Sequence, residues 1–272
     1  MAAQFLKVGN CKIAYIEKNQ NASKTIFFIS GNSVSKSCWR KQYESDLSST
    51  YRMIAIDFPA HGDSDAAEET SYTLPGLAWL LSKVIISLAN GNPYIISGVS
   101  LGTNVIAEML AFEIHPLGIV LAGSSIAGKN FGIERFIKPN THVGVVFADN
   151  PEEEDILKYA HETLASRNEE DLKLFLEDFK KVKPPFRSAL GKSIADGNYN
   201  DEIALLNGEN IPCLMIFGKD ELVIDCNYLD KANLPLWHKT IYKIGGASHL
   251  VNIDQPEKFN QLLKKFADDI FK

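Results

Sequence analysis

The chain of 272 residues is 45% hydrophobic and 23% charged, a composition that excludes a disordered or fibrous protein. Its formal net charge of −6 disfavours sequence-independent binding of nucleic acid, which needs a basic face. No apolar run approaches the roughly 18 residues needed to span a bilayer, and residues 1–8 lack the pattern of a signal peptide. Four widely spaced cysteines without a C-x-x-C pair favour a reduced, cytoplasmic location.

Short β-type runs alternate with longer helical patterns, which predicts an α/β fold with a mostly parallel central sheet flanked by helices. Continuous apolar runs such as I-F-F-I and C-L-M-I-F suit central strands that are buried on both sides. The predicted strands are Cys11–Glu17, Thr25–Ser30, Met53–Asp57, Tyr94–Ser97, Gly118–Ala122, Cys213–Phe217 and Thr240–Ile244. The predicted helices are Ser37–Leu47, Leu74–Ala89, Gly102–Phe112 and Pro256–Phe271.

Residues 128–207 break this alternation. They contain two acidic helical patterns, 151–166 and 169–183, and no convincing buried strand. We therefore expect a core domain made of residues 1–127 and 208–272, with residues 128–207 inserted as a helical cap. Such an insertion would lie as a lid over the edge at which the sheet strands end.

The pentapeptide from Gly98 to Gly102 matches G-x-S-x-G and stands between an apolar strand and an apolar-periodic helix. A strand that turns sharply into a helix holds its central residue in a strained conformation, so the flanking positions must be small. Ser100 Oγ would then project from the carboxyl edge of the sheet, near the positive end of the following helix. Ser100 is therefore the candidate nucleophile.

A second turn, Gly31-Asn32-Ser33, follows the predicted strand that ends at Ser30. In acyl transfer, the oxyanion of the tetrahedral intermediate needs two N–H donors about 3 Å away. We assign these donors to the backbone N–H groups of Asn32 and Leu101, and we expect Gly31 and Val99 beside them to contact substrate. The alternative for the first segment is an ordinary polar turn.

A third strand end carries two candidate acids, Asp220 and Glu221, directly after Gly218-Lys219. A carboxylate there could orient a histidine and stabilise its imidazolium. Adjacent side chains diverge, so we expect only one of the two to face the site. Position alone leaves the choice open.

His249 follows a predicted strand and a Gly-rich turn, and it alone among the six histidines completes the chain order Ser…acid…His. We assign it as the catalytic base. His61 lies before the pentapeptide in a tight loop, 57–64, and is expected to be a structural, hydrogen-bonded histidine. The remaining histidines are expected at the surface or at caps: His115, His142, His161 and His238.

Together these residues resemble the α/β-hydrolase superfamily over nearly the whole chain. The family acid commonly lies three residues after a strand-end glycine, so the resemblance implies Glu221 rather than Asp220. The segments similar to family motifs are Ser30–Asn32 for the oxyanion turn, Asp57–Ser64 for D-x-P-G-H-G-x-S, Gly98–Gly102 for the nucleophile elbow and Gly246–His249 for the terminal G-x-x-H.

The chain also departs from the usual family pattern. Ser30 stands where the family commonly has His, and this change could alter the hydrogen bonding behind the oxyanion turn. Ala60 and Thr103 stand where Gly is frequent, and the acid is Glu rather than Asp. A serine nucleophile disfavours the subfamilies that use Asp, the haloalkane dehalogenases and epoxide hydrolases.

Within the superfamily, the chain looks most like the α/β-hydrolase-type N-acyl-homoserine lactonases. The segments that carry this resemblance are Gly31–Ser35, Gly218–Glu221 and Asp155–Ala160. A cap tyrosine that contacts substrate in those enzymes would fall on Tyr159. The alternative is a helix tyrosine that packs only on its neighbours.

We therefore predict a serine hydrolase that cleaves a carboxylic ester or lactone, with no metal or organic cofactor. Its partner would be a small-molecule substrate, with no nucleic acid and no membrane insertion. Other possibilities are a thioesterase, a non-catalytic member that binds a ligand in the same pocket, and an aminopeptidase in which residues 152–154 bind an amino terminus. A solvated helix start explains those three glutamates better, because carboxylates favour a first turn.

Overall fold

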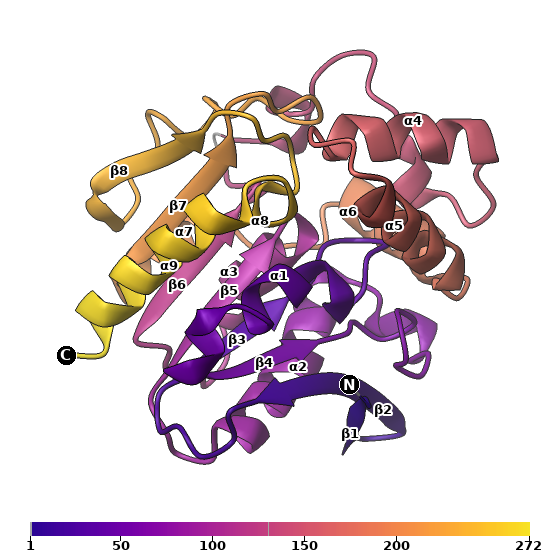
Figure 1. Ribbon diagram of the computed structural model, residues 1–272. Coiled ribbons are helices and arrows are strands. Elements are labelled where there is room, and N and C mark those ends of the chain that lie inside the picture. The colour runs from indigo at the N-terminus through magenta and orange to yellow at the C-terminus, as the bar shows by residue number, and fades with distance from the viewer. Residues whose placement is uncertain (1, 130) are drawn as a thin grey trace.

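An eight-stranded sheet forms the centre of the computed structural model, which describes residues 2–129 and 131–272 (Figure 1). The strand order is β1-β2-β4-β3-β5-β6-β7-β8. Strands β3 to β8 pair in parallel, whereas β1 and β2 are antiparallel at one edge. The strands are β1 Gln4–Val8, β2 Cys11–Lys18, β3 Thr25–Ile29, β4 Arg52–Ile56, β5 Tyr94–Val99, β6 Gly118–Ala122, β7 Cys213–Gly218 and β8 Leu236–Ile244.

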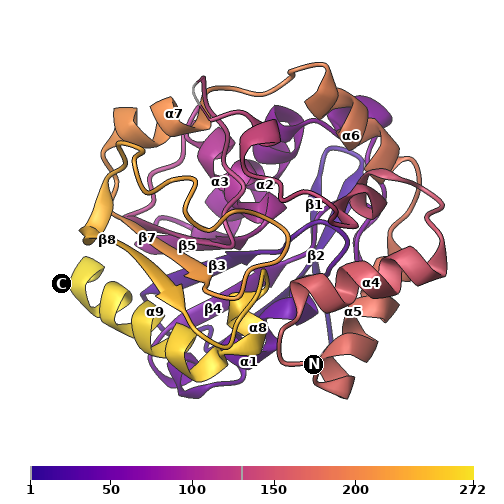
Figure 2. The same cartoon turned by 90° about the horizontal axis from the view of Figure 1, so that it is seen from above.

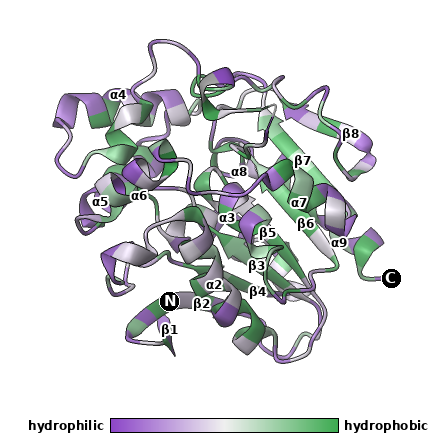
Figure 3. Cartoon of the chain, turned by 180° about the vertical axis from the view of Figure 1, so that it is seen from behind, coloured by the Kyte–Doolittle hydropathy of each residue, from purple (hydrophilic) through white to green (hydrophobic). Residues whose placement is uncertain are grey.

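The predicted mostly parallel sheet is confirmed. Every residue of the central strands β3, β5, β6 and β7 is buried, as their continuous apolar runs indicated. Strand β1 was not expected from the sequence, and β8 begins at Leu236 rather than Thr240. Figure 3 shows the same division, with hydrophobic residues concentrated in the sheet and hydrophilic residues on the outer helices.

Helices cover both faces of the sheet, with α2, α3 and α7 on one side and α1, α8 and α9 on the other (Figure 2). The single helix expected over residues 37–47 is wrong, because Ser45 caps a separate turn by accepting a hydrogen bond from the Leu47 N–H. The elements are η1 Lys36–Trp39, α1 Arg40–Tyr43, η2 Asp46–Ser49, η3 Glu69–Ser71, α2 Leu74–Ala89, α3 Leu101–Met109, α8 Val251–Asp254 and α9 Pro256–Ile270.

Residues 128–207 are mainly helical where the structure describes them. Helices α4, α5 and α6 lie together beyond one end of the sheet, in the upper right of Figure 1, whereas α7 packs against α3. The elements are η4 Ile133–Arg135, η5 Val143–Phe147, α4 Glu153–Thr163, α5 Glu169–Lys181, α6 Phe186–Ala195 and α7 Glu202–Glu209. None of the helices in the described residues is long and apolar enough to cross a bilayer.

Candidate active site

Ser100 occupies the turn between β5 and α3 in a strained backbone conformation, with φ 53° and ψ −125°. Its N–H donates to the Ala122 carbonyl of β6 at 3.0 Å, which fixes the turn against the sheet. The flanking glycines are sterically required. A Cβ on Gly98 would lie 2.7 Å from the Gly102 carbonyl oxygen, and a Cβ on Gly102 would lie 2.6 Å from the Ile29 carbonyl oxygen. The geometry is that of the strand–turn–helix expected from the pentapeptide.

Three predicted side chains from distant parts of the chain meet at this turn. Ser100 Oγ lies 2.9 Å from His249 Nε2, and His249 Nδ1 lies 2.8 Å from Glu221 Oε2. Both His249 and Glu221 are almost fully buried. With Nδ1–H donating to the carboxylate, the Nε2 lone pair is free to accept a hydrogen bond from the Ser100 hydroxyl.

The Glu221 carboxylate is held in place by its own loop. Its Oε1 accepts hydrogen bonds from the backbone N–H groups of Val223 at 2.8 Å and Ile224 at 3.3 Å. Asp220 instead turns outward and accepts from the Gly246 N–H at 2.7 Å, in the turn that precedes His249. The structure thus brings Glu221 to the histidine and leaves Asp220 to support the turn.

The two residues expected to supply the oxyanion donors, Asn32 and Leu101, line the same cavity as Ser100. Leu101 is the first residue of α3, so its N–H has no acceptor within the helix. Gly31 approaches closely, since a Cβ there would lie 3.2 Å from Ser100 Cβ. Among the described residues, no acceptor occupies the backbone N–H of Asn32, while its side-chain Nδ2 donates to the Val146 carbonyl at 2.9 Å.

His61 is buried behind this turn, away from the cavity. Its Nε2 accepts from the Ser33 N–H at 3.0 Å, and its Nδ1 donates to the Pro59 carbonyl at 3.0 Å. Burial lowers the pKa of His61 to about 4, so the ring is neutral at pH 7. This is the structural role that its place in the loop indicated. Of the histidines in the described residues, only His249 lines the cavity.

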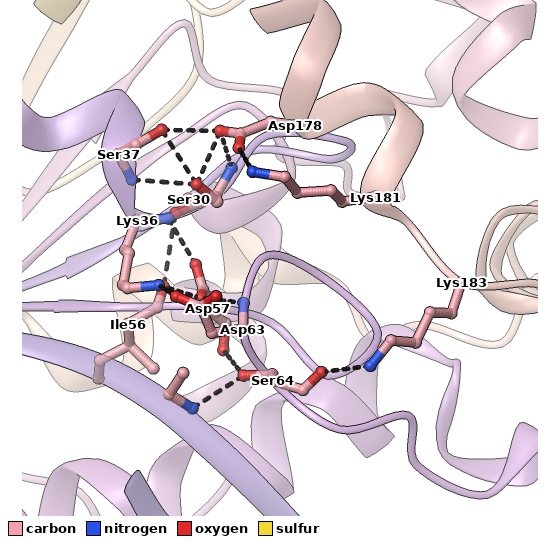
Figure 4. A network of polar contacts seen from close by, with 12 residues as sticks. Ser30, Lys36, Ser37, Ile56, Asp57, Asp63, Ser64, Asp178, Lys181 and Lys183 are labelled. Atoms are coloured by element: carbon pink, nitrogen blue, oxygen red, sulfur yellow. Dashed lines mark hydrogen bonds and ion pairs between the residues drawn. The ribbon is translucent and has the colours of Figure 1, made fainter. Parts of the chain in front are cut away.

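An ion-pair network with a buried pair, Lys36 and Asp57, at its centre lies at the loop that contains His61, and sequence reasoning did not find it (Figure 4 shows the ion pairs). Lys36 Nζ lies 2.6 Å from Asp57 Oδ2 and 2.7 Å from Asp63 Oδ2, and the Lys36 N–H also donates to Asp57. Lys36 and Asp57 are 21 residues apart in the chain, and no motif pairs them. Ser30, where the family commonly has His, donates to the Ile56 carbonyl at 3.4 Å.

A cavity with about 670 Å³ of empty space, part of it open to solvent, adjoins Ser100 and His249. Its lining is largely apolar, and much of it comes from the helical segment: Ile133, Phe136, Val143, Val146, Phe147 and Ile194. Asn32 and Leu101 also line it.

The expected substrate contact of Val99 is not supported, because this last residue of β5 is fully buried and lies outside the described lining. Gly31 is also outside that lining, although its backbone adjoins Ser100.

Comparison with known proteins identifies the family. A family model described as the alpha/beta hydrolase family matches residues 26–262, which is most of the chain. The chain belongs to the α/β-hydrolase family. No curated protein sequence matches it significantly.

Solved structures of a lactonase and of two esterases share the fold of this chain. The N-acyl homoserine lactonase AidH, complexed with N-hexanoyl homoserine lactone, has a TM-score of 0.90 and 22% identity over 99% of this chain and 98% of that chain. An esterase from Rhodococcus sp. ECU1013 has a TM-score of 0.78 and 21% identity, over 99% of this chain and 100% of that chain. A thermophilic esterase from Thermogutta terrifontis has a TM-score of 0.78 and 16% identity, over all of both chains.

Tyr159 of α4 fits both alternatives considered for it. Its ring packs near Phe175, with centroids 6.1 Å apart, and the residue also lines the cavity beside His249. Burial raises the pKa of its hydroxyl, so the group is a neutral hydrogen-bond donor. Among the described residues, no hydrogen-bond partner occupies that hydroxyl, which leaves it available to a ligand.

A polar cluster at the cavity wall was also missed. Asn104 Nδ2 donates to the Ser125 carbonyl at 2.7 Å and to Glu202 Oε2 at 2.8 Å. The same Glu202 oxygen accepts from the Ala127 N–H at 2.6 Å, and burial raises the pKa of Glu202 well above its usual value. These bonds join α3, the loop after β6 and α7. Asn104 and Glu202 are 98 residues apart, so no local pattern predicts their contact.

Within residues 2–129 and 131–272, no group of three or more His, Cys, Asp or Glu side chains is placed to hold a metal ion.

Proposed function

We propose that this α/β-hydrolase is a serine hydrolase that cleaves a carboxylic ester or lactone. The proposal is carried by one observation: the chain of hydrogen bonds from Ser100 through His249 to Glu221, 2.9 and 2.8 Å long, beside an apolar cavity that Ser100 and His249 line. Such a chain activates a serine that is otherwise a weak nucleophile.

The reaction would proceed through an acyl-enzyme. His249 takes the proton of Ser100 as Oγ attacks the carbonyl carbon, and Glu221 holds the imidazole in the required tautomer and stabilises its charge. The protonated His249 then gives its proton to the leaving alkoxide. A water molecule activated by the same base releases the acid and restores Ser100.

The backbone N–H groups of Asn32 and Leu101 would stabilise the oxyanion that forms in both steps. Donors fixed before the reaction need no reorganisation when the charge develops, and each is worth about 3 kcal/mol of barrier. Because these donors are main-chain groups, their strength depends on the backbone geometry of the two turns.

We further propose that the substrate carries an acyl chain and that N-acyl homoserine lactones are candidates. The apolar lining suits an acyl chain, because ligand pockets are lined mainly by hydrophobic and aromatic side chains. AidH, whose fold this chain shares, has been solved with N-hexanoyl homoserine lactone. In this proposal residues 128–207 act as the cap over the cavity, and the Tyr159 hydroxyl donates to a polar group of the substrate.

The aminopeptidase alternative has less support. Glu153 pairs with Lys180 at 2.8 Å, Glu154 pairs with Lys158 at 2.8 Å, and Glu152 is the N-cap of α4. All three side chains are exposed, and none lines the described cavity. They are therefore poorly placed to bind an amino terminus near Ser100.

The test is hydrolysis of a p-nitrophenyl butyrate ester by the native chain and by Ser100→Ala. We expect the variant to lose at least about 10⁴-fold in kcat, because the nucleophile is gone, while its circular-dichroism spectrum stays the same. Turnover that survives in Ser100→Ala would refute the assignment. A fluorophosphonate probe separates the enzyme from a non-catalytic binder, since only an activated Ser100 reacts with it.

A panel of substrates then resolves the bond type. Esters, thioesters and homoserine lactones of graded acyl length, with one aminoacyl-naphthylamide, would be compared by kcat/KM. A preference for the lactones supports the finer proposal. Preferential cleavage of the naphthylamide would instead favour the aminopeptidase.

A further inference from the structure

The turn that carries Asn32 continues to η1 as residues 31–37, which we name the oxyanion loop. The core holds this loop through His61, which accepts from the Ser33 N–H, and through Asp57, which binds the Lys36 N–H and ammonium. The helical segment 128–207 holds the same loop from the opposite side. None of the contacts from that segment is part of the proposed chemistry.

Asp178 of α5 makes the most concentrated of these contacts. Its Oδ2 lies 3.0 Å from the Ser35 backbone nitrogen and 2.7 Å from the hydroxyl oxygens of both Ser35 and Ser37. Figure 4 shows this carboxylate reaching down to the loop from its helix. Asp178 is only 7% exposed. A buried carboxylate that accepts several bonds fixes its donors, since each bond lost would leave a buried charge less satisfied.

Arg187 of α6 holds the neighbouring position. Its Nε donates to Ser33 Oγ at 2.9 Å, and its Nη2 donates to the Phe179 carbonyl near the end of α5. Its guanidinium carbon also lies 3.9 Å from the centre of the Phe179 ring. This buried fork therefore joins α5, α6 and the loop in a fixed arrangement.

The position of Asn32 explains why these contacts matter. On one side of it, Gly31 approaches Ser100, and on the other Ser33 is held in a left-handed conformation, with φ 64°. A serine keeps that conformation only where its surroundings enforce it. The direction of the Asn32 N–H therefore depends on how Ser33 and Ser35 are fixed, and each is fixed partly from the helical segment.

We propose that Asp178 and Arg187 are positioning residues that set the Asn32 N–H for the oxyanion. The inference rests on the proposed serine-hydrolase function and deepens it. The helical segment supplies more than a wall for the substrate cavity, because it also sets the geometry that stabilises the transition state. A donor displaced by a fraction of an ångström stabilises the oxyanion less while leaving ground-state binding nearly unchanged.

The test compares Asp178→Asn with a matched control, Asp171→Asn. Asp171 lies about two turns earlier on α5, is also buried, and joins the helix to the core through Arg40 at 2.5 Å and Lys41 at 2.8 Å, two residues outside the oxyanion loop. We expect Asp178→Asn to lower kcat for p-nitrophenyl butyrate about 10- to 100-fold, with KM within about threefold. Asp171→Asn should lower the melting temperature but keep kcat within about threefold of the native value.

Two further measurements separate positioning from general loss of structure. The affinity of an alkyl boronic acid, which forms a tetrahedral adduct with Ser100, should fall in Asp178→Asn in proportion to kcat/KM. Hydrogen–deuterium exchange of residues 31–37 should rise in the same variant, while exchange at 98–102 stays native. The exchange measurement does not depend on turnover, so it tests the loop even if no ester is cleaved.

The milder variant Ser37→Ala removes one hydroxyl from Asp178 and keeps the proposal testable if Asp178→Asn fails to fold. We expect it to lower kcat about 3- to 10-fold, and to add little when combined with Asp178→Asn. Equal losses of kcat in Asp178→Asn and Asp171→Asn would overturn the proposal. Native kcat, boronate affinity and exchange in Asp178→Asn would overturn it as well. Absence of both ester cleavage and Ser100 labelling in the native chain would instead refute the proposed function.

Discussion

The two sides of the active site are built in different ways. On the nucleophile side, five consecutive residues determine the turn, because glycines at 98 and 102 admit a backbone approach that any Cβ would block. On the oxyanion side, the loop 31–37 is fixed by partners between 21 and 154 positions away in the chain. The nucleophile side can therefore be recognised in the sequence as a motif. The oxyanion side depends on the assembled tertiary structure.

The largest expected effect is at Glu221, the carboxylate that binds His249 beside Ser100. Glu221→Gln keeps the shape of the acid but removes the charge that holds the His249 tautomer, so kcat should fall about 10⁴-fold. The matched variant Asp220→Asn changes the neighbouring residue, whose side chain accepts from the Gly246 N–H, and should stay within about tenfold. Steady-state kinetics on one ester measures both. The reverse ranking would move the acid role to Asp220.

The next prediction concerns the buried pair of Lys36 and Asp57, through which the core holds the oxyanion loop. Lys36→Met leaves the Asp57 carboxylate buried without its cation, which should lower the free energy of unfolding by about 4 kcal/mol. Lys180→Met is the control, because it breaks an exposed, solvent-screened pair with Glu153 and should lower the free energy of unfolding far less than Lys36→Met does. Urea unfolding followed by tryptophan fluorescence measures both. Equal losses of unfolding free energy in the two variants would show that burial does not distinguish the two ion pairs.

A third prediction concerns the nucleophile side alone. Gly102→Ala places a Cβ 2.6 Å from the Ile29 carbonyl oxygen and 2.7 Å from that of Ser30, so the elbow must shift. We expect a loss of about 3 kcal/mol of stability together with most of the activity. Gly208→Ala in α7 meets nothing within 4 Å and should be neutral or slightly stabilising. A native Tm and kcat for Gly102→Ala would contradict the steric account.

The smallest expected effect is a pH dependence of stability from His61. Its pKa is about 4 in the folded chain, against 6.5 for an unperturbed histidine, so the unfolded state binds more protons between these values. Stability is therefore full above pH 6.5 and falls as the pH drops toward 4, by roughly 2 kcal/mol between pH 7.5 and 5.

The variant His61→Gln should flatten this part of the stability curve. His115→Gln, which changes an exposed histidine, should keep the native slope. Urea unfolding at a series of pH values checks both variants. An unchanged slope in His61→Gln would assign the pH dependence to other groups.

The fold and the nucleophile side were predictable because their signals are local. Apolar runs identified the central strands, and two glycines at fixed spacing identified the elbow. Strand β1 was missed because its residues are only half-buried or exposed, including Phe5 at 54%, so its pattern is that of an edge. The helix expected over residues 37–47 was wrong because Ser35, just before this range, and Ser45, within it, each cap a short 3₁₀ turn in place of a continuous helix.

The contacts of Asp178, Arg187 and Lys36 could not be predicted from the sequence. Each joins residues far apart in the chain through polar groups, and hydrophobic periodicity carries no information about such pairs. Asp178 and Arg187 also lie in helical patterns whose acids and bases look like those of any solvated helix. Only the folded chain shows that these two side chains face inward.

The hydrogen bonds from α5 and α6 to the oxyanion loop have a consequence for protein engineering. Exchanging the helical segment with that of a relative is an obvious route to a new substrate range, since the segment forms much of the cavity wall. Such a graft would also remove Asp178 and Arg187, the side chains that bind Ser33, Ser35 and Ser37. A working chimera must therefore take residues 33–37 from the same relative as the helices, so that the loop and its binding partners stay together.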